Sequence, residues 1–454
     1  MNPINHPDFD GLNQGQQIIA LAAHCRDDNM LITGGGGVGK SHLIGFLSKI
    51  IPNLVLCAST GIAGVNIDGT TIDTFMGFNQ HTQTVEDAQK VTSDIKKRLS
   101  ATTVLLIDES SMVRADKLDM VDARLRAVFG NDKPFGGVKV ILVGDFLQLP
   151  PVVANGRETV RYIQRYKERL FAFESDVYQR AGFVPYLLNE YVRQGDDKTR
   201  RIMRFMRMGH KLNEVVDFIN TEAKGNVDKG SLQICKTNSR VESINKAAFA
   251  RLKTQMFSCT GVVEGEFKDN ALPSERKLYL KKGCRVLLTA NNPDAGFLNG
   301  DLGEVKGFIN EKGCVPYLIV ALDRGPTVRV EPHEWQNFQY SAMGATMNKK
   351  PIGTFTQFPV RLGYAITGHK SQGMTLDSAI VDLSGRFNAD GLVYVVISRV
   401  RSLRNLKLTG PLRERDICTS EKAKAFTTEV SMEALRRRDA DIAALFGERE
   451  QVAA

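Results

Sequence analysis

The sequence lacks several features that would place it in large classes of protein. No window carries the roughly 18 uninterrupted apolar residues that a membrane-spanning helix needs. No C-x-x-C pair occurs, and the seven cysteines are scattered singly, a pattern typical of reduced thiols and not of a zinc site or a disulfide framework. The N-terminal stretch MNPINHPDFDGLNQ is polar and contains acids, so we expect neither a signal peptide nor a transit peptide. We therefore expect a protein of the cytoplasm of a bacterium or of a phage-infected cell, with no membrane partner.

Length and charge set the next bounds. A chain of 454 residues is too long for one compact core, and two to four domains are expected. Apolar residues make up 42% and charged residues 24%, which is ordinary for a globular protein. The net charge of +9 allows a polyanionic partner without requiring one.

The first 190 residues have an α/β pattern. Four short apolar runs without alternation are typical of strands buried on both faces of a parallel sheet: 30–33, 54–58, 104–108 and 138–145. Each run ends in small or polar residues, and an open α/β sheet binds its ligands at that edge. The mostly polar stretch 64–100 interrupts the pattern and is interpreted as an insertion between two core strands.

The rest of the chain divides into three parts. A second α/β pattern covers 191–261 and 356–411, where SAIVDL is a clear strand. Between these segments, 262–355 is rich in glycine, proline and short alternating runs, which predicts a small all-β insertion. The tail 412–454 is predicted to be helical.

A phosphate-binding loop stands near the N-terminus. LITGGGGVGKSHLIGFL contains Gly34-x-x-x-x-Gly39-Lys40-Ser41 after a strand and before a helix. Backbone N–H groups of the loop and of the helix N-terminus would surround the phosphates of ATP. Lys40 would reach the β and γ phosphates, and the Ser41 hydroxyl would occupy one position on Mg2+.

An acidic pair ends the strand in VLLIDES. Carboxylates at the end of a buried strand are costly unless they hold a metal or activate water. We expect Asp108 to hold Mg2+ and Glu109 to orient the attacking water as a general base.

Later stretches add further candidates for the reaction. VGDFLQLPPV places Gln148 after a core strand, where an amide could sense the γ-phosphate. The chain has no second phosphate-binding loop, so the second α/β half has no evident nucleotide of its own. Its arginines, Arg193 in LNEYVRQ and Arg399 in VYVVISRVRS, could instead neutralise the transferring phosphate.

These stretches together closely resemble the Pif1 family of superfamily 1B DNA helicases. The resemblance runs from about residue 10 to 410. The motifs occur in family order: LNQGQ, GGGGVGKS, CASTGIAGVNIDGTTIDTFMGF, LLIDESSM, RADKLDMVDARLRAV, GDFLQLPPV, FLNGDLGEV, TGHKSQGMTLD and VYVVISRVRSL. Departures are small; Ser110, for example, stands where the family usually has an aliphatic residue.

The resemblance implies an architecture. We expect two RecA-like parallel-sheet domains of the P-loop NTPase class with ATP between them. Domain 1A would cover 1–190 with a 1B wedge at 64–100, domain 2A would cover 191–261 and 356–411, and an SH3-like domain 2B would cover 262–355. A C-terminal helical segment would occupy 412–454.

The resemblance also implies a function and its residues. Hydrolysis of ATP with Mg2+ would drive movement along single-stranded DNA, 5′ to 3′, and unwinding of forked duplex; replication or single-strand-binding proteins would be further partners. The expected catalytic residues are Lys40, Glu109, Gln148, Arg193 and Arg399. The expected ATP-binding residues are Gln16 (reading adenine), Gly34, Gly35, Gly36, Gly37, Val38, Gly39, Lys40 and Ser41. The expected DNA contacts are Ser59, Thr60, Thr74, Thr367, His369 and Lys370, with Phe75 and Phe78 as candidates to stack on bases or split the duplex.

Two other functions share part of this pattern. A DNA-stimulated ATPase that switches shape as a clamp, without unwinding, would share the nucleotide site but would not need TGHKSQG or the β insertion. A small-molecule kinase does not fit the length of the chain or the absence of an acceptor-site motif. For Phe75 and Phe78, packing in the core is the alternative to base stacking.

Overall fold

The computed structural model describes residues 3–452, apart from 80, 154–161, 163, 190–196, 226–229, 268, 270–271, 312 and 385–388. The chain divides by its contacts into two compact units, and each is described separately. Unit 1 comprises 1–192, 337–351 and 420–454, and unit 2 comprises 193–336 and 352–419.

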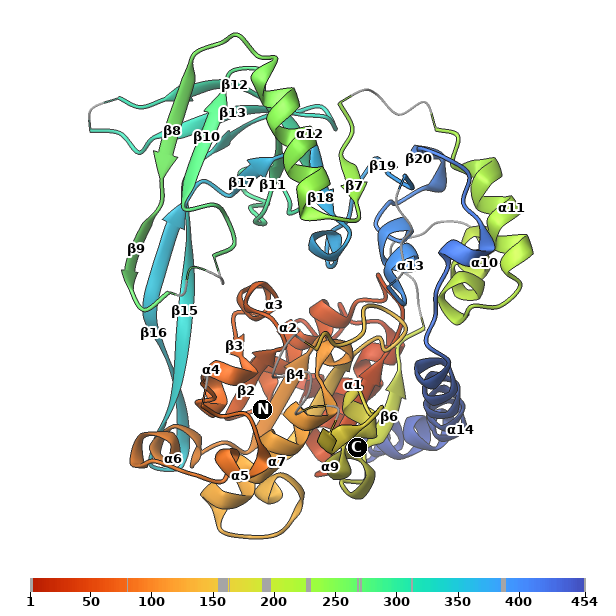
Figure 1. Ribbon diagram of the computed structural model, residues 1–454. Helices are drawn as coiled ribbons and strands as arrows, with labels where there is room; N and C mark the ends of the chain where they lie inside the picture. The colour runs from red at the N-terminus through yellow and green to blue at the C-terminus, as the bar shows by residue number, and fades with distance from the viewer. Residues whose placement is uncertain are drawn as a thin grey trace. The chain divides into compact units, whose positions relative to one another are not determined.

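A six-stranded parallel sheet forms the centre of unit 1 (Figure 1). Its order is β3-β2-β4-β5-β1-β6. The strands are β1 (Met30–Thr33), β2 (Leu54–Ala58), β3 (Thr70–Thr71), β4 (Val104–Asp108), β5 (Lys139–Gly144) and β6 (Val184–Leu187). The α/β class predicted from the sequence is confirmed, and the runs 30–33, 54–58 and 104–108 are strands with those bounds. Every residue of β1, β4 and β5 is buried, which explains why these runs do not alternate.

Helices pack around this sheet. They are α1 (Gln14–Cys25), α2 (Lys40–Ile50), α3 (Gly61–Asn66), α4 (Ile72–Met76), α5 (Val85–Ala88), α6 (Ser93–Leu99), α7 (Ala115–Phe129), α9 (Asp176–Arg180) and α14 (Glu421–Val452). On α2, Leu43, Ile44 and Leu47 are buried at the spacing of one helical face. The stretch 64–100 contains β3 and α4 to α6, and β3 pairs with β2 at the sheet edge.

Two segments from distant parts of the chain complete unit 1. The first is 337–351, the end of a hairpin made by β15 (His333–Met343) and β16 (Thr346–Gln357). The second is α14, which contacts β6 and α1 although it follows them by most of the chain's length. Figure 1 shows this dark blue helix beside β6.

Unit 2 contains a second parallel sheet. Its order is β18-β7-β19-β20, from Ala365–Thr367, Gln233–Cys235, Ala379–Val381 and Leu406–Leu408. The helices of this unit are α10 (Asp197–Met208), α11 (Leu212–Glu222), α12 (Asn238–Ala250) and α13 (Leu392–Ile397). The strand predicted in SAIVDL is β19.

Antiparallel strands lie between residues 256 and 362, a wider range than the 262–355 predicted for the all-β insertion. A five-stranded sheet has the order β14-β13-β12-β11-β17, from Thr327–Val330, Tyr317–Leu322, Leu302–Ile309, Arg285–Leu288 and Val360–Leu362. The other strands are β8 (Met256–Thr260) with β10 (Lys277–Lys281), and β9 (Val262–Gly265) beside β16. Apolar side chains of this sheet, among them Val286, Val305 and Val320, form a separate core. Within the described part of the chain, no helix is both long enough and apolar enough to cross a membrane.

Candidate nucleotide and DNA site

The glycine loop of unit 1 joins β1 to α2. Gly37 and Gly39 have φ of 82° and 84°, the left-handed region that glycine adopts without steric cost. The loop turns back on itself, and the Lys40 ammonium donates to the carbonyl oxygens of Gly34 at 2.8 Å and of Gly35 at 2.9 Å. Because the helix begins after a glycine, no side chain caps its first N–H groups. An uncapped helix N-terminus behind a glycine loop suits a phosphate ligand.

Gln16 fixes the end of this loop. Its side-chain amide donates to the Gly39 carbonyl oxygen at 3.0 Å, and the residue is only 3% exposed. The same side chain accepts from the N–H of Asn13 at 3.0 Å, while Asn13 Oδ1 accepts from the N–H of Gln16 at 2.9 Å, which closes a capping box at the start of α1. The sequence predicted that Gln16 reads adenine; the structure adds a contact to the loop itself.

The acidic pair lies at the carboxyl end of β4. Asp108 is 9% exposed, and burial raises the pKa of its carboxyl group, while the positive charge of Lys40 acts in the opposite direction. Glu109 has φ 51° and ψ 43°, a left-handed conformation that costs a non-glycine residue about 1–3 kcal/mol. Such strain in a general-base candidate, next to a buried carboxylate, is typical of a functional site.

Gln148 belongs to a tight turn after β5. Its side-chain amide donates to Asp145 Oδ2 at 3.2 Å, and its backbone N–H donates to the Asp145 carbonyl oxygen at 2.9 Å. Asp145 Oδ1 also accepts from the N–H of Leu147 at 3.2 Å. We call residues 145–148 the sensor turn. Asp145 is 1% exposed and Gln148 is 6% exposed, so the sensor turn is buried in the core of unit 1.

Three predicted DNA contacts of unit 1 lie around the end of β2. Thr60 caps α3, because its hydroxyl accepts from the N–H of Ala63 at 3.3 Å. Thr74 Oγ1 accepts from the Thr71 hydroxyl at 2.9 Å. The Ser59 hydroxyl is buried and makes no hydrogen bond to the described part of the protein. It lines a pocket of about 230 Å³, and a phosphate oxygen would satisfy this hydroxyl.

The two aromatic candidates are buried. Phe75 is 1% exposed and meets Tyr340 edge-on at 5.7 Å. Phe78 is 7% exposed and lies under the ammonium of Lys117 at 5.1 Å and the guanidinium of Arg124 at 5.3 Å. Both rings are thus buried among side chains of unit 1, which favours packing in the core over base stacking for Phe75 and Phe78.

Tyr340, at the hairpin end, was missed by the sequence analysis. Its hydroxyl accepts from the N–H of Leu56 at 3.4 Å inside unit 1, and its ring packs on Phe75, one residue after Thr74. Asn53 joins the same hairpin end, donating to the Ala345 carbonyl oxygen at 3.0 Å and accepting from the N–H of Met347 at 2.8 Å. The hairpin end thus supports the segment that holds the predicted DNA contacts. No sequence motif signals this docking, since it joins residues almost 300 positions apart.

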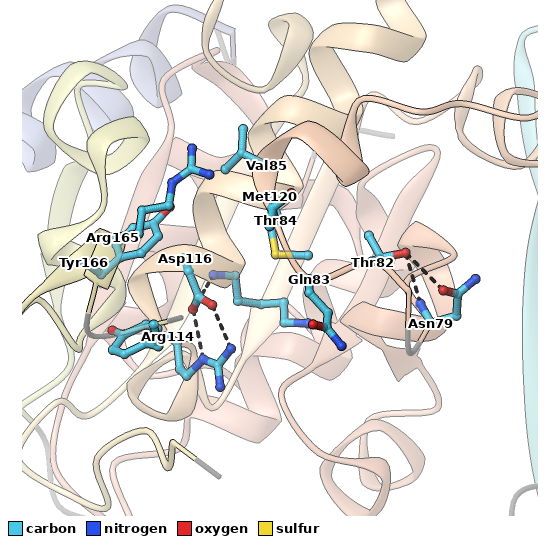
Figure 2. A pocket seen from close by; sticks show the side chains of 12 residues that line it. Asn79, Thr82, Gln83, Thr84, Val85, Arg114, Asp116, Met120, Arg165 and Tyr166 are labelled. Atoms are coloured by element: carbon cyan, nitrogen blue, oxygen red, sulfur yellow. Dashed lines mark hydrogen bonds and ion pairs between the residues drawn. The ribbon is translucent and has the colours of Figure 1, made fainter. Parts of the chain in front are cut away.

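A pocket of about 210 Å³ lies beside α7 (Figure 2). One wall carries Arg114, which forms a two-bond ion pair with Asp116 at 2.9 and 2.7 Å. The facing wall comes from the segment Asn79 and Thr82 to Val85. The Arg165 guanidinium pairs with Glu86 at 2.7 Å across the same region. Helices α5 and α6 of the 64–100 segment contact α7, which is most of the stretch RADKLDMVDARLRAV.

In unit 2, Thr367 ends β18, and His369 and Lys370 lie in the turn that follows it. Thr367 is 6% exposed, and its hydroxyl accepts from the N–H of Lys370 at 3.4 Å. His369 and Lys370 lie at the surface, where the protein still covers part of the imidazole. Partial burial lowers the pKa of His369, which favours the neutral imidazole. This turn can offer donors to a phosphate backbone.

Arg399 follows α13 in unit 2 and is 2% exposed. Its guanidinium donates to the carbonyl oxygen of Val395 at 2.7 Å and to the Ser398 hydroxyl at 2.8 Å, with a longer contact to the Met374 carbonyl oxygen at 3.4 Å. The arginine is thus held by its own unit. Arg193 lies outside the described residues.

A parallel sheet whose first strand feeds a glycine loop and a helix, with an acidic pair and a polar turn on two further strands, defines a P-loop nucleotide hydrolase. The chain belongs to the PIF1-like helicase family. The family model described as PIF1-like helicase matches residues 13–205.

Relatives and solved structures agree with this assignment. The chain is 30% identical over 465 residues to the ATP-dependent DNA helicase Pif1 of Psychrobacter sp., covering 87% of this chain and 68% of that protein. A crystal structure of Bacteroides sp. Pif1 in complex with ADP-AlF4 matches with a TM-score of 0.84 at 29% identity, over 93% of this chain and 97% of that one. Bacteroides Pif1 bound to single-stranded DNA matches with a TM-score of 0.65 at 30% identity, over 93% and 97%. The predicted RecA-like class is confirmed by these matches.

Proposed function

We propose that this chain is an ATP-dependent DNA helicase that moves 5′ to 3′ on single-stranded DNA and separates duplex at a fork. The observation that carries the proposal is the nucleotide site of unit 1, where Lys40, Asp108, Glu109 and the sensor turn follow three strands of one parallel sheet. The name of the Psychrobacter relative, and the nucleotide-analogue and DNA complexes of Bacteroides Pif1, support it. Polarity rests on family resemblance alone.

Each residue of the nucleotide site has a role in this proposal. Lys40 neutralises the β and γ phosphates, and Glu109 orients the attacking water. Gln148 senses the γ-phosphate from the sensor turn. Arg399 and Arg193 stabilise the charge that develops on the transferring phosphoryl group, a role that requires Arg399 to leave its present carbonyl partners.

The residues proposed for Mg2+ have suitable chemistry. Ser41 offers an exposed hydroxyl at the start of α2, and Asp108 offers a carboxylate that burial makes costly to charge in the absence of a cation. These are hard oxygen donors, which Mg2+ prefers over nitrogen and sulfur. When bound, the cation would neutralise charge on the phosphate oxygens.

Contacts to DNA are proposed for small hydroxyls and for one basic turn. Ser59 and Thr60 follow β2 and Thr74 lies in α4, all in unit 1, while Thr367 ends β18 and His369 and Lys370 follow it in unit 2. Hydroxyls and backbone N–H groups hold phosphates without reading sequence, as a translocating enzyme requires. We expect affinity for single-stranded DNA to fall as salt rises and to vary little with base composition.

The test uses the full chain with forked duplexes that carry either a 5′ or a 3′ single-stranded tail. We expect ATP-dependent strand separation with the 5′ tail, and ATP hydrolysis that rises sharply when single-stranded DNA is added. Lys40→Ala should abolish both, while Lys49→Ala, whose ammonium pairs with Asp8 at 2.7 Å on the surface, should not.

The outcomes separate the rival functions. Stimulated hydrolysis without strand separation from either fork would support a DNA-dependent switch or clamp. Unwinding of the 3′-tailed fork alone would reverse the proposed polarity. Hydrolysis that is equal with and without DNA would overturn the helicase and the switch together.

A further inference from the structure

The C-terminal helix α14 is fixed to unit 1 at two places. Near its start, the Lys422 ammonium donates to the Glu168 carbonyl oxygen at 2.8 Å and pairs with Glu174 at 2.9 Å. Further along, the buried carboxylate of Asp441 pairs with Arg26 at 2.8 Å, and Arg26 also donates to the Tyr186 hydroxyl at 3.0 Å. A helix anchored at both places has a defined register on the surface it covers.

Between these anchors, α14 places Phe426 in an aromatic cluster. The Phe426 ring stacks on Phe173 with centroids 3.9 Å apart and an interplanar angle of 8°. It meets Phe146 edge-on, at 5.2 Å and 87°. Phe146 also meets Phe173 edge-on at 5.2 Å and Phe171 at 6.5 Å. The ring of Phe146 is thus enclosed by three other rings, and Phe146 is 2% exposed.

Phe146 is the second residue of the sensor turn. Asp145 holds the backbone of Leu147 and both the backbone and the side chain of Gln148. Because Phe146 lies between these bonded residues, its ring fixes the backbone from which the Gln148 amide is presented. Edge-to-face and stacked rings have preferred geometries, so the cluster fixes an orientation as well as filling volume.

We propose that Phe426 is a positioning residue for hydrolysis: through Phe146, the C-terminal helix holds the sensor turn so that Gln148 can meet the γ-phosphate. The proposal rests on the proposed function, since it takes Gln148 as the group that responds to the γ-phosphate. It adds a residue more than 270 positions downstream of that glutamine, in a segment that carries no helicase motif. If Phe426 had only a packing role, its removal would lower the free energy of unfolding but would not specifically lower kcat or the binding of a transition-state analogue.

The test compares Phe426→Ala with Phe426→Leu and with two variants elsewhere on α14. Met432→Ala replaces a side chain that is 48% exposed, and Asp441→Asn weakens the Arg26 ion pair without touching the aromatic cluster. For Phe426→Ala we expect kcat of DNA-stimulated ATP hydrolysis to fall about five- to tenfold with ADP affinity unchanged, and trapping of ADP with aluminium fluoride to weaken by a similar factor. Phe426→Leu should recover part of the loss. Asp441→Asn should lower the melting temperature and leave kcat within about twofold.

A double-mutant cycle gives the deciding result. In a Gln148→Ala background, Phe426→Ala should have no further effect on kcat, because the group that it positions is absent. Fully additive losses would overturn the proposal, as would a Phe426→Ala variant with normal kcat and aluminium fluoride trapping. A normal kcat for Gln148→Ala would also overturn it, since no sensor would then exist to be positioned. Failure of the helicase proposal itself would be detected separately, as a wild-type protein whose rate of ATP hydrolysis is the same with and without single-stranded DNA.

Discussion

The side-chain amide of Gln16 donates to the carbonyl oxygen of Gly39 at 3.0 Å, which ties helix α1 to the last glycine of the phosphate-binding loop. The fit is close: a Cβ atom on Gly39 would lie 2.5 Å from Gln16 Nε2. The loop is therefore shaped by a residue from outside the loop, and Gln16 has a role that does not depend on the base of the nucleotide.

Gln16→Ala should raise the KM for ATP by about fivefold, since one hydrogen bond to the loop is worth about 1 kcal/mol. If Gln16 acts mainly by holding the loop in place, the KM for GTP should rise by the same factor. A loss confined to ATP would instead show that the amide reads adenine, as the motif suggests. Gln17→Ala is the matched control, because that neighbouring amide donates to the Phe9 carbonyl oxygen at 3.2 Å and does not touch the loop.

Substitution of Glu109 should change the stability of the protein and its ATP hydrolysis in opposite directions. Its left-handed backbone is strained for glutamate and unstrained for glycine. Glu109→Gly should therefore raise the free energy of unfolding by about 1 kcal/mol while hydrolysis falls at least about a hundredfold. Glu109→Gln should lose hydrolysis to a similar degree without the gain in stability.

Thermal unfolding and steady-state hydrolysis measure the two effects. Asp68→Gly is the control for strain alone, because Asp68 also has a φ of 51° but has no proposed role in hydrolysis. That variant should gain stability and keep its activity. A Glu109→Gly variant that hydrolyses ATP normally would remove Glu109 from the reaction.

The sequence predicted the four inner strands of the unit 1 sheet, β2, β4, β5 and β1, because their apolar side chains are buried on both faces. The edge strands β3 and β6 were not predicted. The glycine loop and the acidic pair were also predictable, since their chemistry depends on residues close together in the chain. Contacts between distant segments were not. Neither the packing of Phe426 on Phe146 nor the Tyr340 hydrogen bond to Leu56 leaves a periodic or local signal. The burial of Phe75 follows from the hairpin end that covers it, so sequence spacing could not decide its role.

Phe78 should behave as a packing residue. Its ring lies beneath Lys117 and the buried Arg124, whose pKa is lowered by burial. Phe78→Ala should lower the free energy of unfolding by about 3 kcal/mol, and unwinding and ATP hydrolysis should decline together. Phe78→Leu should restore most of both, because leucine keeps the apolar contact. Unwinding lost at normal stability and normal hydrolysis would instead indicate direct contact with DNA.

Arg399 gives the strictest test of the proposal that an arginine of unit 2 takes part in hydrolysis. Its guanidinium is held by groups of unit 2, at Val395, Ser398 and Met374, so its proposed role requires these bonds to be exchanged for bonds to a phosphate. Arg399→Ala should leave ATP binding largely intact and reduce kcat by about a thousandfold, the scale of a lost arginine finger.

Arg399→Lys should not rescue hydrolysis, since an ammonium lacks the planar fork of donors. Arg401→Ala is the matched control: that guanidinium is 59% exposed and pairs with Asp377 at 3.1 Å. Nucleotide binding by fluorescence and single-turnover hydrolysis separate the two steps. Near-normal turnover in Arg399→Ala, with the melting temperature reduced, would assign the arginine to the structure of α13 and leave the transferring phosphate to be neutralised by other groups.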